Sequence, residues 1–190
     1  MSAVQAPPRT RLRGTDRRER VLDAAVLEFA EHGWHGSRVE AIAGRAGISH
    51  PYLLRLFSSK RDLFTAATDR SFDRMERAFA DAVQADAGDA ILALGAAYRR
   101  LLREDPATLR LHMHALAVAG DEQVGPAVRV RYQALIERMR ELSGASADRV
   151  RTCFAVGLTL TVMTLLDLSD RREDLRWAAK LLASGAASPP

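Results

Sequence analysis

Five polar side chains between residues 49 and 60, in the stretch SHPYLLRLFSSK, could bind a negatively charged partner. They are Ser49, His50, Tyr52, Arg55 and Lys60. Their hydroxyl, imidazole, phenol and cationic groups can all donate hydrogen bonds, and the cations attract phosphate or carboxylate oxygens. These groups can act as one site only if the chain presents them on a common surface.

The small and apolar residues around this stretch predict how it is presented. Ala43, Gly47 and Leu53 have the spacing of a helix-turn-helix, in which Ala43 lets two helices approach, Gly47 forms the turn and Leu53 fills the inside of the second helix. The apolar side is completed by Ile42, Ile48 and Phe57. Because this side is buried, the opposite side of the second helix faces outward and can enter the major groove of DNA.

The excess positive charge lies in the first third of the chain. The net charge is +4, and residues 1–64 carry 11 Lys and Arg against 7 Asp and Glu, whereas residues 65–190 carry 17 of each. Clustered positive charge is typical of a protein that binds a polyanion through phosphate contacts and counterion release. The alternative is a solvated face on an arginine-rich protein.

Composition favours an all-α protein, and the sequence lacks the motifs that would indicate an enzyme. Leu, Ala, Arg and acidic residues dominate, which favours helices because their side chains lose little freedom there. The sequence contains no Gly-rich phosphate loop, no nucleophile elbow, no cluster of metal ligands and no carboxylate pair at helical spacing in an apolar setting. We therefore expect neither catalysis nor a metal or other cofactor.

A cytoplasmic location is expected. The single cysteine, Cys153, cannot form an internal disulfide, and no secretory leader is evident at the N-terminus. The longest apolar stretch, residues 154–166, is shorter than the roughly 20 residues that a membrane span needs, so we interpret it as a buried helix. Cys153 itself is interpreted as an inert core thiol rather than a redox sensor.

Nine helices are predicted between two irregular ends. The first begins near Asp16, with Glu19 as its capping partner, and Gly33 ends it. The second follows a capping box formed by Ser37 and Glu40. The third is capped by Ser49 and the fourth starts at Ser59 and Asp62. The later helices are predicted at residues 60–86, 89–103, 106–118, 122–143, 147–168 and 171–183.

The two ends of the chain are predicted to lack regular structure. Residues 1–15 are interpreted as a disordered basic tail and residues 184–190 as a frayed one. In the first tail, Arg9, Arg11 and Arg13 either form an arm that reaches the DNA backbone or minor groove, or remain solvated.

Residues 16–64, DRRERVLDAAVLEFAEHGWHGSRVEAIAGRAGISHPYLLRLFSSKRDLF, resemble the N-terminal domain of the TetR family of bacterial transcriptional regulators. The resemblance implies a three-helix DNA-binding head at residues 16–64 and a helical ligand-binding and dimerisation body at residues 65–183. It also implies a homodimeric, sequence-specific repressor that a small-molecule effector releases from double-stranded DNA. The alternative is a helical protein-interaction module without DNA binding, which would leave the localised charge unexplained.

Matching positions one by one, the resemblance implies roles for seven residues. Ser37 and Arg38 would touch phosphate at the start of the second helix, and Lys60 would hold a phosphate at the start of the fourth. The residues that would face bases or backbone are Ser49, His50, Tyr52 and Arg55. The chain departs from the family pattern at Leu54, where Tyr is usual, and at Arg38, where Thr is usual.

The middle helices offer candidates for the ligand site. These are the apolar and aromatic residues Tyr98, Leu101, His112, Leu116, Tyr132, Met139 and Phe154, each of which could instead be ordinary core. Few charges occur at such inward positions, which favours an apolar or aromatic effector. His112 and His114 point about 200° apart on a helix, so we expect no shared metal site.

The helix at 147–168 is apolar nearly all round and needs burial on several sides. We expect one side to meet its copy in a second subunit, together with the last helix around Leu175 to Leu182. The alternative is burial entirely within the monomer. A two-fold dimer predicts a palindromic operator, with half-sites about one helical turn apart.

Overall fold

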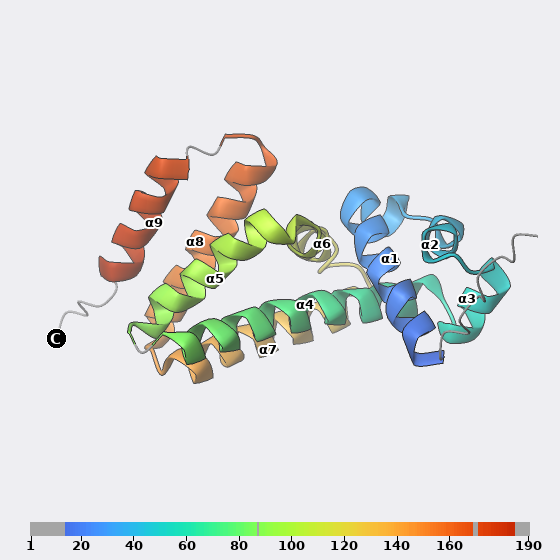
Figure 1. Cartoon of the computed structure of the whole chain (residues 1–190), viewed down its shortest axis with the longest axis horizontal. Coiled ribbons are helices and arrows are strands. Elements are labelled where there is room, and N and C mark those ends of the chain that lie inside the picture. Colours follow the sequence, from blue (N-terminus) through green and yellow to red (C-terminus); the bar gives the residue numbers. More distant parts are fainter. Residues whose placement is uncertain (1–13, 87, 169–170, 185–190) are drawn as a thin grey trace, which may run out of the picture.

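The computed structural model describes residues 14–86, 88–168 and 171–184, and within these ranges the chain forms nine helices and no strand (Figure 1). The first four helices are α1 Gly14–Gly36, α2 Val39–Ala46, α3 His50–Leu56 and α4 Lys60–Ala85. The other five are α5 Ala90–Glu104, α6 Pro106–Ala117, α7 Gly125–Ser143, α8 Ala147–Leu165 and α9 Arg171–Ser184. The all-α prediction is confirmed. The arginines of the N-terminal tail and residues 185–190 lie outside the described residues.

Helices α1, α2 and α3 form a head at one end of the molecule, and α9 lies at the other end (Figure 1). The core of the head is built on fully buried side chains, among them Phe29, Ile42, Leu53 and Phe64. The rings of Phe29 and Phe64 meet edge to face, with centroids 5.0 Å apart. Because Phe64 belongs to α4, the head is fixed to the start of the long helix that enters the body.

The predicted corner between α2 and α3 is confirmed. Gly47 has φ 67° and ψ 36°, the left-handed conformation that favours glycine. The N–H of Ile48 donates to the carbonyl of Ala43 at 3.0 Å, which closes the end of α2. Ile42, Ala43 and Leu53 are all buried, as the spacing predicted.

One of the next two predictions about helix ends is confirmed and the other is wrong. α1 begins at Gly14, two residues from the predicted start near Asp16, and it is bent at Gly33, which has φ 67°. The capping box at Ser37 does not form: the cap position of α2 is Arg38, and the Ser37 hydroxyl donates to the carbonyl of Trp34. Instead the buried Glu28 accepts the N–H of Arg38 at 3.3 Å. A side chain from α1 therefore caps α2.

The predicted start of α4 is confirmed, since the N–H of Asp62 donates to the Ser59 hydroxyl at 3.1 Å. α4 then runs through the body, with α7 beside it (Figure 1). The later helices begin and end within three residues of the predicted positions.

α6 is shared between two apolar cores. Leu111 and Ala115 are buried in the core of the head, together with Val124 and Val128 from the start of α7. Leu109, from the same helix, is buried in the core of the body. α6 also packs extensively against α1, so the head and the body are joined by direct contact as well as through α4.

None of the described helices is long and apolar enough to cross a membrane.

Candidate nucleic-acid interface and internal cavity

The outer face of α3 carries the side chains that the sequence predicted. Ser49 and Arg55 are exposed, and His50 and Tyr52 are half-buried. Leu53, between them on the inner face, is fully buried. This arrangement leaves the donors and the cation of α3 available to a duplex while its apolar side holds the helix on the head.

Two arginines of α1 lie beside α3 and were missed by the sequence reasoning. The guanidinium of Arg17 lies over the ring of Tyr52, 5.6 Å from its centroid, and that of Arg18 lies 4.4 Å from the centroid of Phe57. Cations attract aromatic faces at these distances. The positive charge excess of the head was a signal for such residues, but the sequence did not show that α1 and α3 meet here.

Lys60 and Ser37, two of the predicted DNA contacts, form hydrogen bonds within the head. Lys60 Nζ donates to the carbonyl of Ser37 at 2.7 Å and lies 5.1 Å from the Trp34 ring centroid. Partial burial lowers the pKa of Lys60. The Ser37 side chain is buried, whereas Arg38 is exposed. Lys60 thus ties α4 to the end of α1, and its phosphate contact stays a prediction.

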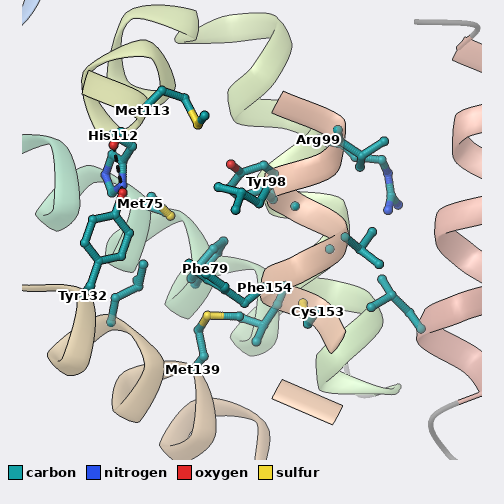
Figure 2. A pocket seen from close by; sticks show the side chains of 18 residues that line it. Met75, Phe79, Tyr98, Arg99, His112, Met113, Tyr132, Met139, Cys153 and Phe154 are labelled. Atoms are coloured by element: carbon teal, nitrogen blue, oxygen red, sulfur yellow. Dashed lines mark hydrogen bonds between the residues drawn. The ribbon is translucent and has the colours of Figure 1, made fainter. Parts of the chain in front are cut away.

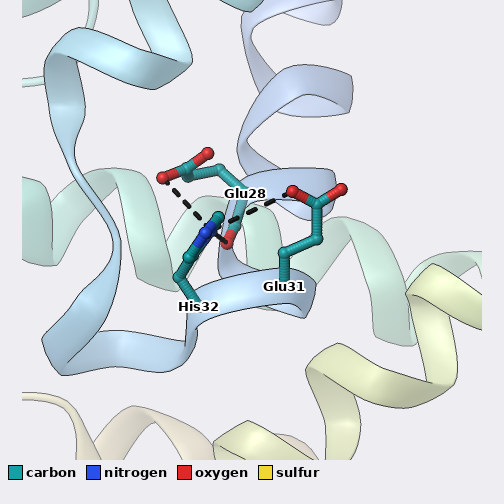
Figure 3. Close-up of side chains that lie close together, drawn as sticks. All are labelled: Glu28, Glu31 and His32. Atoms are coloured by element: carbon teal, nitrogen blue, oxygen red, sulfur yellow. Dashed lines mark hydrogen bonds and ion pairs between the residues drawn. The ribbon is translucent and has the colours of Figure 1, made fainter.

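Glu28, Glu31 and His32 of α1 lie close together (Figure 3). One ligand atom from each lies within 4.8 Å of the others, a spacing that could hold a metal ion. Arg45 of α2 pairs with both carboxylates, with 3.3 Å from its Nε to Glu28 Oε2. The guanidinium therefore already supplies the positive charge that these carboxylates face, and the cluster holds α1 against α2.

A cavity lies among α4, α5, α6, α7, α8 and α9, and part of it is open to solvent (Figure 2). Five of the seven predicted ligand-site residues line it: Tyr98, His112, Tyr132, Met139 and Phe154. Leu101 is buried in the neighbouring core, and Leu116 is half-buried outside the lining. Met75, Phe79 and Met113 were missed because an apolar residue on a helix gives no sign of whether it faces core or cavity.

The polar groups of the cavity are mostly paired with the protein. The Tyr98 hydroxyl hydrogen-bonds Thr161 Oγ1 at 2.6 Å, and the Tyr132 hydroxyl donates to the backbone carbonyl of His112 at 2.9 Å. Burial raises the pKa of Tyr98 to about 12 and raises that of Tyr132 further. Both phenols are therefore neutral, and Cys153 is also neutral because burial raises its thiol pKa to about 11.

His112 and His114 lie on opposite sides of α6, as predicted. His112 is buried, with its ring centroid 4.1 Å from that of Phe72, and burial lowers its pKa to about 3. His114 packs instead against Gly33 of α1. α6 thus turns one histidine towards the cavity and the other towards the head.

Comparison with known proteins identifies the family. Residues 21–67 match the family model of bacterial regulatory proteins of the tetR family. The chain is also 32% identical over 154 residues to the transcriptional activator FasR of Mycolicibacterium smegmatis, a match that covers 78% of this chain and 69% of FasR.

The chain belongs to the TetR family of bacterial transcriptional regulators.

Two further TetR-family proteins extend the comparison. The repressor KstR of Mycolicibacterium smegmatis is 34% identical over 86 residues, which cover 45% of this chain and 38% of KstR. The solved structure of a TetR-family member from Streptomyces coelicolor A3 superposes with a TM-score of 0.74 at 20% identity, over 90% of this chain and 98% of that one. This protein is therefore a DNA-binding transcriptional regulator with the TetR fold and not an enzyme. The alternative of an interaction module without DNA binding is set aside.

Proposed function

We propose that this TetR-family regulator acts as a homodimer that binds a palindromic operator and releases it when a small molecule fills the cavity. The observation that carries the proposal is the shared position of α6. Its residues His112 and Met113 line the cavity, whereas Leu111 and Ala115 are buried in the core of the head. A ligand that moves α6 must also move part of the core on which the head is built.

The DNA-binding part of the proposal assigns base contacts to α3 and backbone contacts to the residues around it. Arg55 is exposed near the end of α3, where it can reach the edge of a guanine. Arg38 is exposed at the start of α2, and Arg17 lies beside Tyr52. These two arginines, with Lys60, would bind phosphates and set the register of the head on the duplex.

The dimer would form through α8 and α9. Ala155, Thr159, Val162 and Leu166 recur at i, i+4, i+7 and i+11 along α8 and its end, and all four are exposed. Val162 is 38% exposed and Leu166 is 61% exposed, and Trp177 of α9 is 41% exposed. A row of exposed apolar and small side chains is typical of a helix-packing interface. The side chain of Leu175, which the sequence placed in this interface, lies outside the described residues.

A two-fold dimer would place two α3 helices on two half-sites of opposite orientation, which is why the operator would be palindromic. Ligand binding would favour a spacing of the two heads that the operator does not match. A coupling free energy of about 1–3 kcal/mol, the usual range, would weaken operator binding by roughly 5- to 150-fold. We propose repression as the sign of control. In that case the bound regulator blocks the target gene, and release of the operator switches the gene on.

The test is binding of the full chain to duplex DNA from upstream of its own and neighbouring genes, at low and moderate salt. A steep fall in affinity with salt is expected, since several phosphates are contacted. Arg55→Ala should change the ranking of operator variants at the contacted base pair, by about 1–3 kcal/mol. Arg138→Ala removes the same charge from α7, where Arg138 is exposed, and should leave the ranking unchanged. Equal rankings for wild type and Arg55→Ala would contradict the role of α3 in base recognition.

A further inference from the structure

His112 carries the one polar atom of the cavity wall that is buried and unpaired in the described part of the chain. Its Nε2 has no hydrogen-bond partner there, whereas the hydroxyls of Tyr98 and Tyr132 both have partners. Buried polar atoms in proteins are nearly always hydrogen-bonded, so an unpaired one at a cavity calls for an explanation.

The ring of His112 is held in place by its surroundings. It packs against Phe72 with the two ring planes tilted by 52°, and the ring of Tyr132 meets it edge to face at 5.8 Å. The backbone of Ser71 also lies close to the imidazole. In the tautomer of the neutral ring that carries its proton on Nδ1, Nε2 is a hydrogen-bond acceptor, and a bound donor would select that tautomer.

The charges around the cavity define what can lie beside His112. Burial lowers the pKa of His112 so far that the ring is neutral at physiological pH. No carboxylate lines the described cavity, and its only cationic side chain is Arg99. Figure 2 shows Arg99 on the opposite side from His112, with its guanidinium pointing away towards α9. The His112 side of the cavity therefore offers an acceptor and apolar surface, with no ionic partner.

We propose that the cavity binds an uncharged, largely apolar molecule that carries one hydrogen-bond donor, a hydroxyl or an N–H, and that this donor binds Nε2 of His112. This inference rests on the proposed ligand-responsive function and names the chemical class of its effector. A molecule that lacks the donor leaves Nε2 buried and unpaired. Sites of this kind discriminate strongly against such analogues.

The experiment uses three naphthalene probes of nearly equal size with the full chain. 1-Naphthol carries the donor, 1-methoxynaphthalene has an acceptor only, and 1-naphthoate is an anion. Titration calorimetry should show 1-naphthol binding at least tenfold more tightly than either of the others, which corresponds to about 1.4 kcal/mol. In protein with ¹⁵N-labelled histidine, 1-naphthol but not 1-methoxynaphthalene should shift the Nε2 resonance of His112.

Two variants complete the test. His112→Phe should bring the ratio of the 1-naphthol and 1-methoxynaphthalene affinities close to one, whereas Tyr98→Phe should leave it unchanged because that hydroxyl is already paired with Thr161. Equal affinities in the wild type, an unchanged ratio in His112→Phe, or no binding of any probe would overturn the inference. The ¹⁵N measurement needs no variant and decides the question even if His112→Phe folds poorly. Operator binding is measured on the same wild-type preparation, and its absence would refute the proposed function instead.

Discussion

His114 packs directly against Gly33, so closely that a Cβ built on Gly33 would lie 2.9 Å from Nδ1 of His114. The contact joins α6 to α1 at the point where α1 bends. Gly33 is required there for two reasons: its φ of 67° disfavours other residues, and the His114 ring occupies the space that a side chain would need.

Gly33→Ala should therefore destabilise the protein. The combination of φ 67° with ψ −174° is essentially restricted to glycine and costs a residue with a Cβ roughly 1–3 kcal/mol, and the contact with His114 adds to it. His114→Ala in the same chain should recover the part due to the contact and leave the backbone cost. The free energy of unfolding in urea, measured for both single variants and the double variant at one protein concentration, gives the coupling. Additive effects of the two substitutions would show that the contact is not tight.

Lys60→Ala should weaken DNA binding and also lower stability, whereas Arg38→Ala should weaken DNA binding alone. The reason is that Lys60 donates to the Ser37 carbonyl within the head, while Arg38 is exposed. Loss of the Lys60 interactions should cost about 1 kcal/mol in the free energy of unfolding. Affinity for several unrelated duplexes should fall by a similar factor in both variants. A Lys60→Ala variant with wild-type stability would show that its contacts with α1 contribute nothing.

Glu28→Ala should destabilise the head more than Glu28→Gln. The buried carboxylate accepts the N–H of Arg38 and pairs with Arg45; Gln keeps an acceptor, whereas Ala leaves both groups without a partner. We expect a loss of about 2–3 kcal/mol for Ala and about 1 kcal/mol for Gln. Glu122→Gln is the matched control, because Glu122 is exposed and lies outside this cluster, and it should stay within about 0.5 kcal/mol of wild type. Chemical denaturation of the four proteins measures these differences; equal losses for all three variants would contradict the cap.

His112 should make the protein sensitive to acid. Burial lowers its pKa from 6.5 to about 3 in the folded state, so below pH 6.5 the unfolded chain binds a proton that the folded chain does not. Its contribution to stability is therefore complete above pH 6.5 and is lost as pH falls towards 3. Between pH 8 and 5, wild type should lose about 2 kcal/mol more than His112→Phe. Parallel stability profiles for the two proteins would mean that His112 is protonated as easily when folded as when unfolded.

Val162→Glu should dissociate the proposed dimer, because Val162 lies in the exposed row along α8. Val130→Glu makes the same change at a valine of α7 that is 62% exposed and lies outside that row, and it should leave the dimer intact. Sedimentation velocity at micromolar concentration distinguishes the two states. A Val162→Glu variant that is still a dimer would show that the interface lies elsewhere. A wild type that is a monomer would refute the proposed dimer.

The sequence predicted local features well and long-range contacts poorly. Ser59 and Asp62 formed the predicted cap. The same pattern at Ser37 and Glu40 did not, because Glu28 of α1 accepts the N–H of Arg38 at the start of α2 instead. No local pattern contains that information. In the same way, the sequence offered His112 as a candidate for the ligand site, whereas its unpaired Nε2 depends on what α4 and α7 place around it.

The sharing of Leu111 and Ala115 with the head has a consequence for protein engineering. The head is not a module that can be cut out at residue 64 and grafted onto another regulator, since the excised piece would expose the surface that these two side chains cover. A functional chimera has to include α6 together with the first three helices. Otherwise a helix of the new partner has to be redesigned so that its side chains cover the same surface of the head.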